Sequence, residues 1–142
     1  MKMKASLAAV IVTVITPTIL LAAEDWRIGT ARGLQTYSVS VEGGSLVMVC
    51  DPDRVYNPDV SYANFVVTLP KDPTARQIVF LSATGQQAAF DVRDGTATQQ
   101  DAGPADWAAL VVMIQQGGTI AVVTARDTFS LDMTVMADFD CE

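Results

Sequence analysis

One stretch, residues 103–123, restricts the folds open to this chain more than any other. It reads GPADWAALVVMIQQGGTIAVV, and its apolar residues follow the i, i+3, i+4, i+7 spacing of one helical face: Trp107, Leu110, Val111 and Ile114. This spacing predicts an α-helix near residues 104–116. Such a helix must lay its apolar face on another layer, and we expect Trp107 to anchor that core.

Both ends of this helix carry signals of their own. Pro104 suits the first turn, where its missing N–H has no helical partner. Asp101 just upstream, or Asp106 inside the first turn, places negative charge near the positive end of the helix. Gly117 follows the last turn and can end the helix without a steric penalty. Residues 119–124, rich in Ile and Val, are then expected to form a buried strand.

The other segments are short strand patterns separated by turns. Residues 34–41 (LQTYSVSV) alternate between apolar and polar side chains, which is typical of a half-buried strand. Turns and loops rich in Gly, Pro, Asn and Asp separate this pattern from the others. Further strands are predicted at residues 45–50, 63–69, 77–81, 87–92 and 128–133, with a loop at 51–61 and a polar connection at 96–103.

The tail, residues 129–142, alternates with a period of two, which indicates a strand. Residues 135–140 of the tail also fit the apolar spacing of a helix, so both a strand and a helix remain alternatives for this segment. No internal repeat or domain linker is present. The whole pattern predicts a mainly β fold, an antiparallel β-sandwich or half-barrel, with one covering α-helix near residues 104–116.

Residues 1–23 have the pattern of a secretory signal peptide. Lys2 and Lys4 precede an apolar run, and small residues precede Glu24. The apolar run is too short for a comfortable membrane span. We therefore expect residues 24–142 to be a single exported β-rich domain, periplasmic or secreted, with no membrane attachment after cleavage.

The charge of the chain is strongly negative, with 16 acidic and 9 basic residues. Removing residues 1–23 takes away two lysines and no acidic residue, so the formal charge goes from −7 to −9. This balance argues against nucleic acid and against anionic lipid as partners. It is compatible with a basic envelope protein as partner, and equally with a role in solubility alone.

The chain has two cysteines, Cys50 and Cys141. In an exported protein we expect them to form a disulfide that joins the C-terminal end to an early strand. Closing a loop of this length contributes roughly 4 kcal/mol in the chain-entropy model.

The absence of histidine restricts the chemistry of the chain. It removes the usual general base, the Ser-His-Asp and Cys-His arrangements and the commonest metal ligand. A hydrolase based on two carboxylates is the remaining enzymatic alternative. Asp51, Asp53 and Asp59 lack the spacing of an EF-hand and are interpreted as turn formers rather than calcium ligands. We expect a non-catalytic protein without a cofactor.

A short motif, Ser82-Ala83-Thr84-Gly85, lies between two predicted strands. It resembles the exposed Ser-x-x-Gly loop of the C-type lysozyme inhibitors, which are small exported β-barrels. The resemblance implies inhibition of a basic cell-wall hydrolase, toward which an acidic protein would be steered. A plain hairpin turn explains these four residues equally well.

A second resemblance spans more of the chain. The segments that carry it are Leu46–Cys50, Phe90–Gly95, Trp107–Leu110, Gly117–Val122, Phe129–Leu131 and Cys141. Their pattern is similar to that of the periplasmic accessory proteins associated with type VI secretion, and in broad style to the invasion-associated locus B proteins. The resemblance implies an envelope role exercised through protein contacts and transfers no catalytic residue.

The sequence thus predicts a non-catalytic periplasmic binding or accessory protein, with a proteinaceous inhibitor of a cell-wall hydrolase as the alternative. Two groups of residues are candidates for partner binding. One is the hairpin motif, and the other is the polar side of the alternating tail, which serves equally well to protect a strand edge. The candidate residues are Ser82, Thr84, Gly85, Asp132, Asp138 and Asp140.

Overall fold

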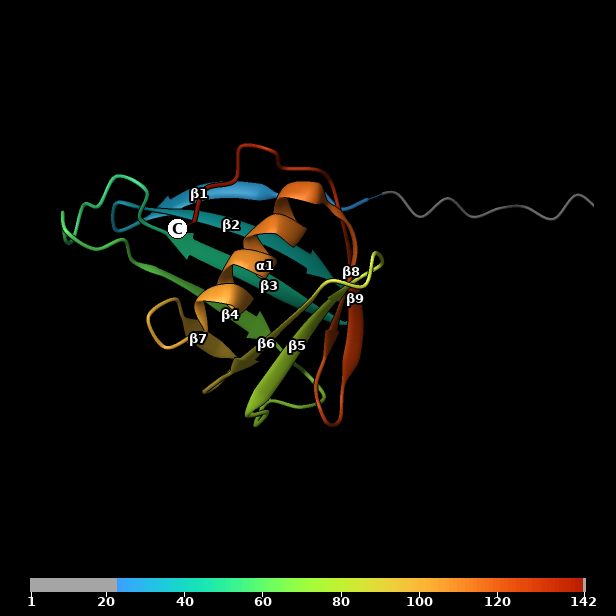
Figure 1. Cartoon of the computed structure of the whole chain (residues 1–142). Coiled ribbons are helices and arrows are strands. Elements are labelled where there is room, and N and C mark those ends of the chain that lie inside the picture. The colour runs from blue at the N-terminus through green and yellow to red at the C-terminus, as the bar shows by residue number, and fades with distance from the viewer. Residues whose placement is uncertain (1–22, 142) are drawn as a thin grey trace, which may run out of the picture.

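The computed structural model describes residues 23–141, which form two antiparallel sheets and one helix (Figure 1). Sheet 1 has the strand order β1-β2-β3-β4-β7 and sheet 2 the order β6-β5-β8-β9. The strands are β1 (Arg27–Ala31), β2 (Leu34–Val41), β3 (Gly44–Cys50), β4 (Ala63–Thr68), β5 (Gln77–Ser82), β6 (Gln87–Asp91), β7 (Thr96–Thr98), β8 (Gly118–Val123) and β9 (Thr128–Met133), and the helix is α1 (Pro104–Gln116).

The expected β-sandwich with one covering helix is confirmed. The helix occupies the predicted residues, and β2 and β9 have the predicted bounds. Two strands were not expected. β1 has Gly29 at its centre and Ile28 as its one large apolar residue, so it shows no alternation, and β7 is only three residues long. Within the described part of the chain, no helix has the length and apolar character needed to cross a bilayer.

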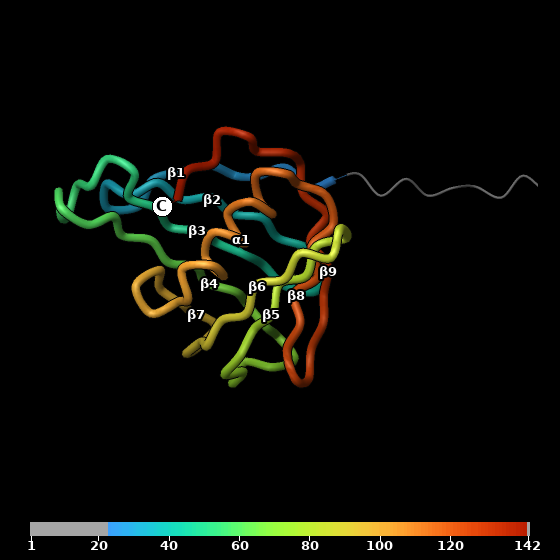
Figure 2. The backbone as a smooth tube through the Cα atoms, viewed as in Figure 1, coloured from blue at the N-terminus to red at the C-terminus, as the bar shows by residue number. Residues whose placement is uncertain are grey.

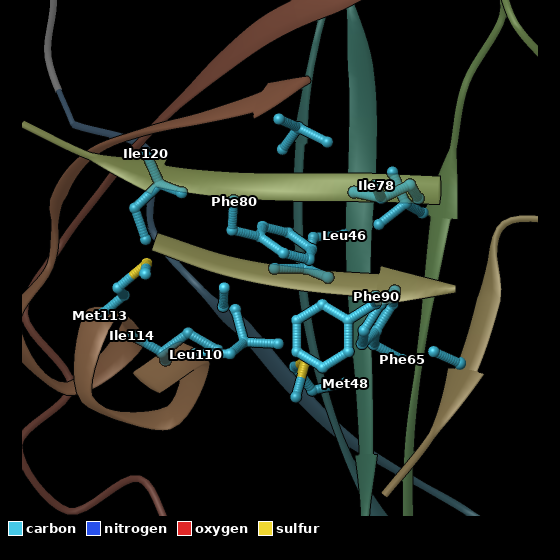
Figure 3. Close-up of a cluster of buried hydrophobic side chains, with 14 of the residues drawn as sticks. Leu46, Met48, Phe65, Ile78, Phe80, Phe90, Leu110, Met113, Ile114 and Ile120 are labelled. Carbon is cyan, nitrogen blue, oxygen red and sulfur yellow. The ribbon is translucent and has the colours of Figure 1, made fainter. Parts of the chain in front are cut away.

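The core is centred on four aromatic rings that join the three layers. Phe65 of β4 meets Phe80 of β5 edge to face at 5.3 Å and Phe90 of β6 at 5.0 Å. Trp107 of α1 stacks on Phe65 at 6.3 Å and meets Phe90 at 6.2 Å. Figure 3 shows Phe65, Phe80 and Phe90 among the aliphatic side chains of both sheets and the helix. Trp107 is 2 % exposed, which confirms it as a core residue.

The C-terminal tail was expected to continue as a strand or a helix, and it does neither. β9 ends at Met133, and residues 134–141 run without regular structure. Helix side chains bind the carbonyl groups of the tail instead of a neighbouring strand. Trp107 Nε1 donates to the carbonyl oxygen of Cys141 at 2.8 Å, and Gln115 Nε2 donates to that of Phe139 at 2.9 Å.

The tail completes the core beside sheet 1. The expected disulfide between Cys50 and Cys141 is confirmed, with the two Cα atoms 5.0 Å apart. Phe139 packs edge to face on Tyr37 at a centroid distance of 5.0 Å. Burial, and secondarily the negative charge of Asp140, raises the pKa of Tyr37.

Glycine lets the two sheets approach closely at the turn between β2 and β3. A Cβ atom added at Gly44 would lie 2.6 Å from Cζ of Phe129, which belongs to β9, and 2.6 Å from the carbonyl oxygen of Thr68. The paired glycines of this turn therefore make room for a side chain of the other sheet.

Residues 1–22 of the expected export signal lie outside the described residues.

The two tryptophans provide a matched test of the hydrogen bond to the tail. Trp107→Phe leaves the buried carbonyl of Cys141 without its donor, so we expect a loss of about 1–3 kcal/mol in the free energy of unfolding. Trp26→Phe is the control, because Trp26 Nε1 is buried and has no partner among the described groups. Urea unfolding of both variants measures the difference, and an equal or larger loss in Trp26→Phe would contradict the assigned role.

The disulfide offers a second stability prediction. Its two cysteines are 91 residues apart, so the Cys50→Ala/Cys141→Ala variant should lose about 4 kcal/mol through the larger entropy of the unfolded chain. Urea unfolding of the oxidised protein and of the variant measures this loss. Equal midpoints would show that the hydrogen bonds to the tail hold it without the covalent link.

Candidate functional site

The outward face of sheet 1 differs in charge from the rest of the chain. The strand registers place Arg27 on this face, and no Asp or Glu occupies any of its positions in the five strands. The central strands present hydroxyl, amide and valine side chains there: Thr36, Ser38, Ser40, Ser45, Val47, Val49, Asn64, Val66 and Thr68. We call this surface the acid-free face. It contrasts with a chain that has 16 acidic residues.

A hollow of about 530 Å³ crosses one end of the acid-free face. It lies between the turn that joins β1 to β2 and the loop, residues 51–62, that joins β3 to β4. Figure 1 shows both segments projecting from the same end of the molecule. We call the hollow the loop groove. Its lining consists of Ala31, Leu34, Val49, Tyr56, Val60 and Tyr62, with Arg32, Asn57, Ser61 and Gln100 as the polar members.

The buried carboxylate of Asp51 shapes the loop that walls the groove. It accepts hydrogen bonds from the backbone N–H groups of Val55 at 2.8 Å and Tyr56 at 3.2 Å. The backbone of Asp51 also donates to the carbonyl of Tyr62 at 2.9 Å, which closes the base of the loop. Asp51 thus acts as the turn former that the sequence predicted.

Two tyrosines connect this loop to its surroundings. The hydroxyl of Tyr56 donates to the carbonyl oxygen of Arg32 at 2.7 Å, which ties the loop to the turn between β1 and β2. The hydroxyl of Tyr62 accepts from Asn64 Nδ2 at 2.8 Å. With both hydroxyls bonded to the protein, the rings offer mainly carbon to a ligand.

Exposed apolar side chains gather on the loop that walls the groove. Val55, Tyr56 and Val60 are 59 %, 61 % and 49 % exposed, and Tyr62 at the end of this loop is also exposed. Exposed apolar side chains grouped in this way are typical of interaction sites in soluble proteins.

The charge of the groove is positive, in contrast to that of the chain. Among the described residues, Arg32 is the only charged one in its lining. Arg54 lies on the loop and donates to the carbonyl of Pro58 at 3.3 Å. Both arginines adopt the left-handed backbone conformation, with φ of 53° and 51°. The acidic residues Asp53 and Asp59 belong to the same loop but do not line the groove.

The hairpin motif predicted as a binding loop lies far from this groove. Figure 2 shows the turn between β5 and β6 at the opposite end of the backbone from the loop at residues 51–62. Its hydroxyls bond within the turn, since Ser82 Oγ lies 2.9 Å from Thr84 Oγ1 and accepts from Gln86 N at 3.0 Å. Gly85 has a φ of 88° and supplies the left-handed position of the turn. Partner binding by this motif stays a prediction.

The acidic residues of the tail do not form the strand row that the sequence indicated. Asp132 lies on β9, opposite Thr119 of β8. Asp138 and Asp140 are exposed but lie in the irregular segment after the strand. The tail leaves the sheet at Met133, and side chains of α1 bind its carbonyls at Phe139 and Cys141. The period-two pattern therefore does not place these carboxylates in line.

Two other features are less suited to binding or catalysis. The described residues contain no group of three His, Cys, Asp or Glu side chains arranged to hold a metal ion. A second hollow, of about 510 Å³, lies between the β4–β5 connection and the turn from β8 to β9. Its buried carboxylate, Asp72, already accepts a hydrogen bond from the Thr124 hydroxyl at 2.8 Å.

The loop groove was not found from the sequence. The Pro, Asn and Asp content of residues 51–61 predicts a solvated loop and no binding surface. The signal against that interpretation is the apolar content of the segment, which includes Val55, Tyr56 and Val60. Apolar residues in a loop that cannot reach the core are available to a ligand.

Comparisons of this chain with protein families, with curated proteins and with solved structures find no match. The surface of the protein is therefore the basis on which its function is inferred.

Proposed function

We propose that this chain is a non-catalytic binding protein of the cell envelope, which holds a partner protein on the acid-free face and the loop groove. The observation that carries the proposal is the charge of this surface. The chain has 16 acidic residues, and none occupies an outward position in the strands of sheet 1 or the described lining of the groove.

The composition of the surface supports a protein as partner. The centres of protein interfaces are depleted in acidic residues and lysine and enriched in tyrosine and arginine. Tyr56, Tyr62 and Arg32 line the groove, and Arg27 lies at the edge of the face. Val47 and Val66 are cross-strand neighbours at its centre.

The envelope location is part of the proposal and rests on the leader-like residues 1–23 and on the disulfide. Disulfides persist in oxidising compartments, with which Cys50–Cys141 is compatible. The resemblance to periplasmic accessory proteins of type VI secretion favours the same class of role. The arginines of this surface favour a partner with acidic groups around its contact area. The acidic surfaces of the rest of the chain would attract basic partners at long range.

A matched pair of charge variants tests the proposal. Val66→Asp puts a carboxylate at the centre of the acid-free face, and Leu81→Asp puts one on the outward face of sheet 2. The two side chains are 37 % and 40 % exposed, so the effects on folding should be similar. We expect Val66→Asp to reduce retention of the partner about tenfold or more, because an unpaired carboxylate would be desolvated in the interface.

The measurement is retention of envelope proteins by each immobilised protein at physiological salt, quantified by mass spectrometry. A partner retained by the wild type and by Leu81→Asp, but not by Val66→Asp, is the expected result. Equal retention by all three proteins would place the interface elsewhere. Release of every retained protein by modest salt would indicate generic attraction to an acidic surface.

A further inference from the structure

Four strands lie at the edges of the two sheets: β1 and β7 in sheet 1, and β6 and β9 in sheet 2. The outer N–H and C=O groups of an edge strand are a template for pairing with another chain, and proteins usually protect them. Three of these four edges are protected, each in a different way.

The protection of β6 and β9 comes from other parts of the chain. On β6, the N–H of Ala89 donates to Asp106 Oδ1 of the helix at 2.9 Å. Beside β9, the N–H of Glu24 donates to the carbonyl of Asp132 at 2.6 Å, and the N–H of Thr134 donates to the carbonyl of Glu24 at 3.3 Å. β7 has only three residues, and short edges pair poorly.

β1 has no such protection among the described residues. All five of its residues are exposed, and β2 is its one strand partner within residues 23–141. The strand reads RIGTA and contains neither proline nor lysine, the residues that commonly block an edge. Gly29 at its centre lets another backbone approach closely.

The turn after β1 shows which backbone groups face outward. Arg32 and Gly33 have φ of 53° and 85°, the signature of a type I′ turn, and Ala31 pairs with Leu34 across it. Because this closing pair is hydrogen-bonded, every second residue of β1 points its N–H and C=O away from β2. Ile28 and Thr30 therefore present their backbone groups to the free side.

The free edge is continuous with the loop groove. Ala31, the last residue of β1, and Arg32, which follows it, both line the groove. The groove then runs across the end of sheet 1 as far as Gln100, which follows β7. A chain lying along β1 would enter the groove on passing Ala31.

Charge distinguishes between the two kinds of chain that could use this edge. β1 contains Arg27 and no acidic residue, and Arg32 follows it. A second copy of the protein would bring a formal charge of −7 against the same charge, and would oppose one arginine-bearing edge to another. A different polypeptide with carboxylates beside its extended segment meets both arginines favourably.

We infer that β1 binds an extended segment of a partner polypeptide as an added strand of sheet 1. An apolar side chain of that segment occupies the loop groove, and its carboxylates face Arg27 and Arg32. The inference rests on the proposed function and specifies the form of the partner. Main-chain hydrogen bonds to Ile28 and Thr30 supply affinity, and the groove supplies selectivity.

Selection of displayed peptides provides a probe whatever the identity of the partner. A library of random twelve-residue peptides is selected on the disulfide-bonded protein, and one enriched peptide is synthesised for titration. We expect enriched sequences to combine β-branched or aromatic residues with Asp or Glu, and to lack proline in the pairing segment. Failure to enrich any peptide would overturn the inference.

The decisive variant is Thr30→Pro, which removes one outward N–H while sparing the hydrogen bonds between β1 and β2. We expect it to weaken peptide binding about tenfold, whereas the control Thr30→Val, which keeps the N–H and the branched side chain, should stay within about twofold. Near-ultraviolet circular dichroism checks that each variant is folded.

Hydrogen exchange provides a readout that needs no variant. The amides of Ile28 and Thr30 should exchange rapidly in the free protein and become protected when the peptide binds. Protection of residues in the loop groove without protection of these two amides would overturn strand addition.

A third variant, Val60→Asp in the groove, separates this inference from the proposed function. Loss of binding in Val60→Asp with none in Thr30→Pro would overturn strand addition and leave the proposed function standing. Unchanged peptide binding in both variants would overturn the inference, and the retention experiment with Val66→Asp would still decide the proposed function. Sedimentation that shows a dimer of the wild type, abolished in Thr30→Pro, would assign the edge to a second copy and overturn the inference.

Discussion

The packing of Trp107 between the two sheets is the contact on which the other parts of the fold depend. Its ring touches Phe65 of sheet 1 and Phe90 of sheet 2, and its N–H holds the carbonyl of Cys141. Cys141 is bonded in turn to Cys50, the last residue of β3, and the loop that walls the groove begins at the next residue. That loop is thus fixed at its base to the least exposed part of the core, which limits the ordering entropy that binding would cost.

The distribution of charge separates the surface into two parts with different consequences. A net negative charge keeps copies of the chain apart and attracts cations at long range. On the acid-free face that repulsion is locally absent, and the backbone, hydroxyl and apolar groups can be desolvated without stranding a carboxylate. The overall charge is compatible with a basic partner, whereas the local charge of this face is compatible with one that carries acidic groups. These two preferences act at different separations of the two proteins. The net charge of the chain acts at long range, before contact, whereas the residues of the face act once the partner is in contact.

The sequence predicted those elements whose local pattern agrees with their final environment. α1 and β2 carry apolar residues at the spacing of a buried face, because each packs one face on the same core, and their bounds were found correctly. β1 could not be found, since an edge strand exposed on all sides has no buried face to impose alternation. The prediction for the tail, residues 134–141, was wrong for the opposite reason. Its alternation is present, but Phe139 and Cys141 are buried through contacts with α1 and Tyr37 rather than through a strand ladder.

The candidate site could not be predicted from local sequence patterns either. Tyr56 and Val60 stand among turn-forming residues, and only the position of the β1–β2 turn, set by long-range pairing, converts them into a groove wall. The loop groove and the exposed edge of β1 thus have one structural origin, which is the position of the β1–β2 hairpin at the border of sheet 1 beside the β3–β4 loop. Covering β1 with another segment, as Glu24 covers part of β9, would have removed an aggregation hazard. Among residues 23–141 that edge is open next to the groove, and the net negative charge of the chain opposes the approach of a second copy. This combination suits the proposed strand addition.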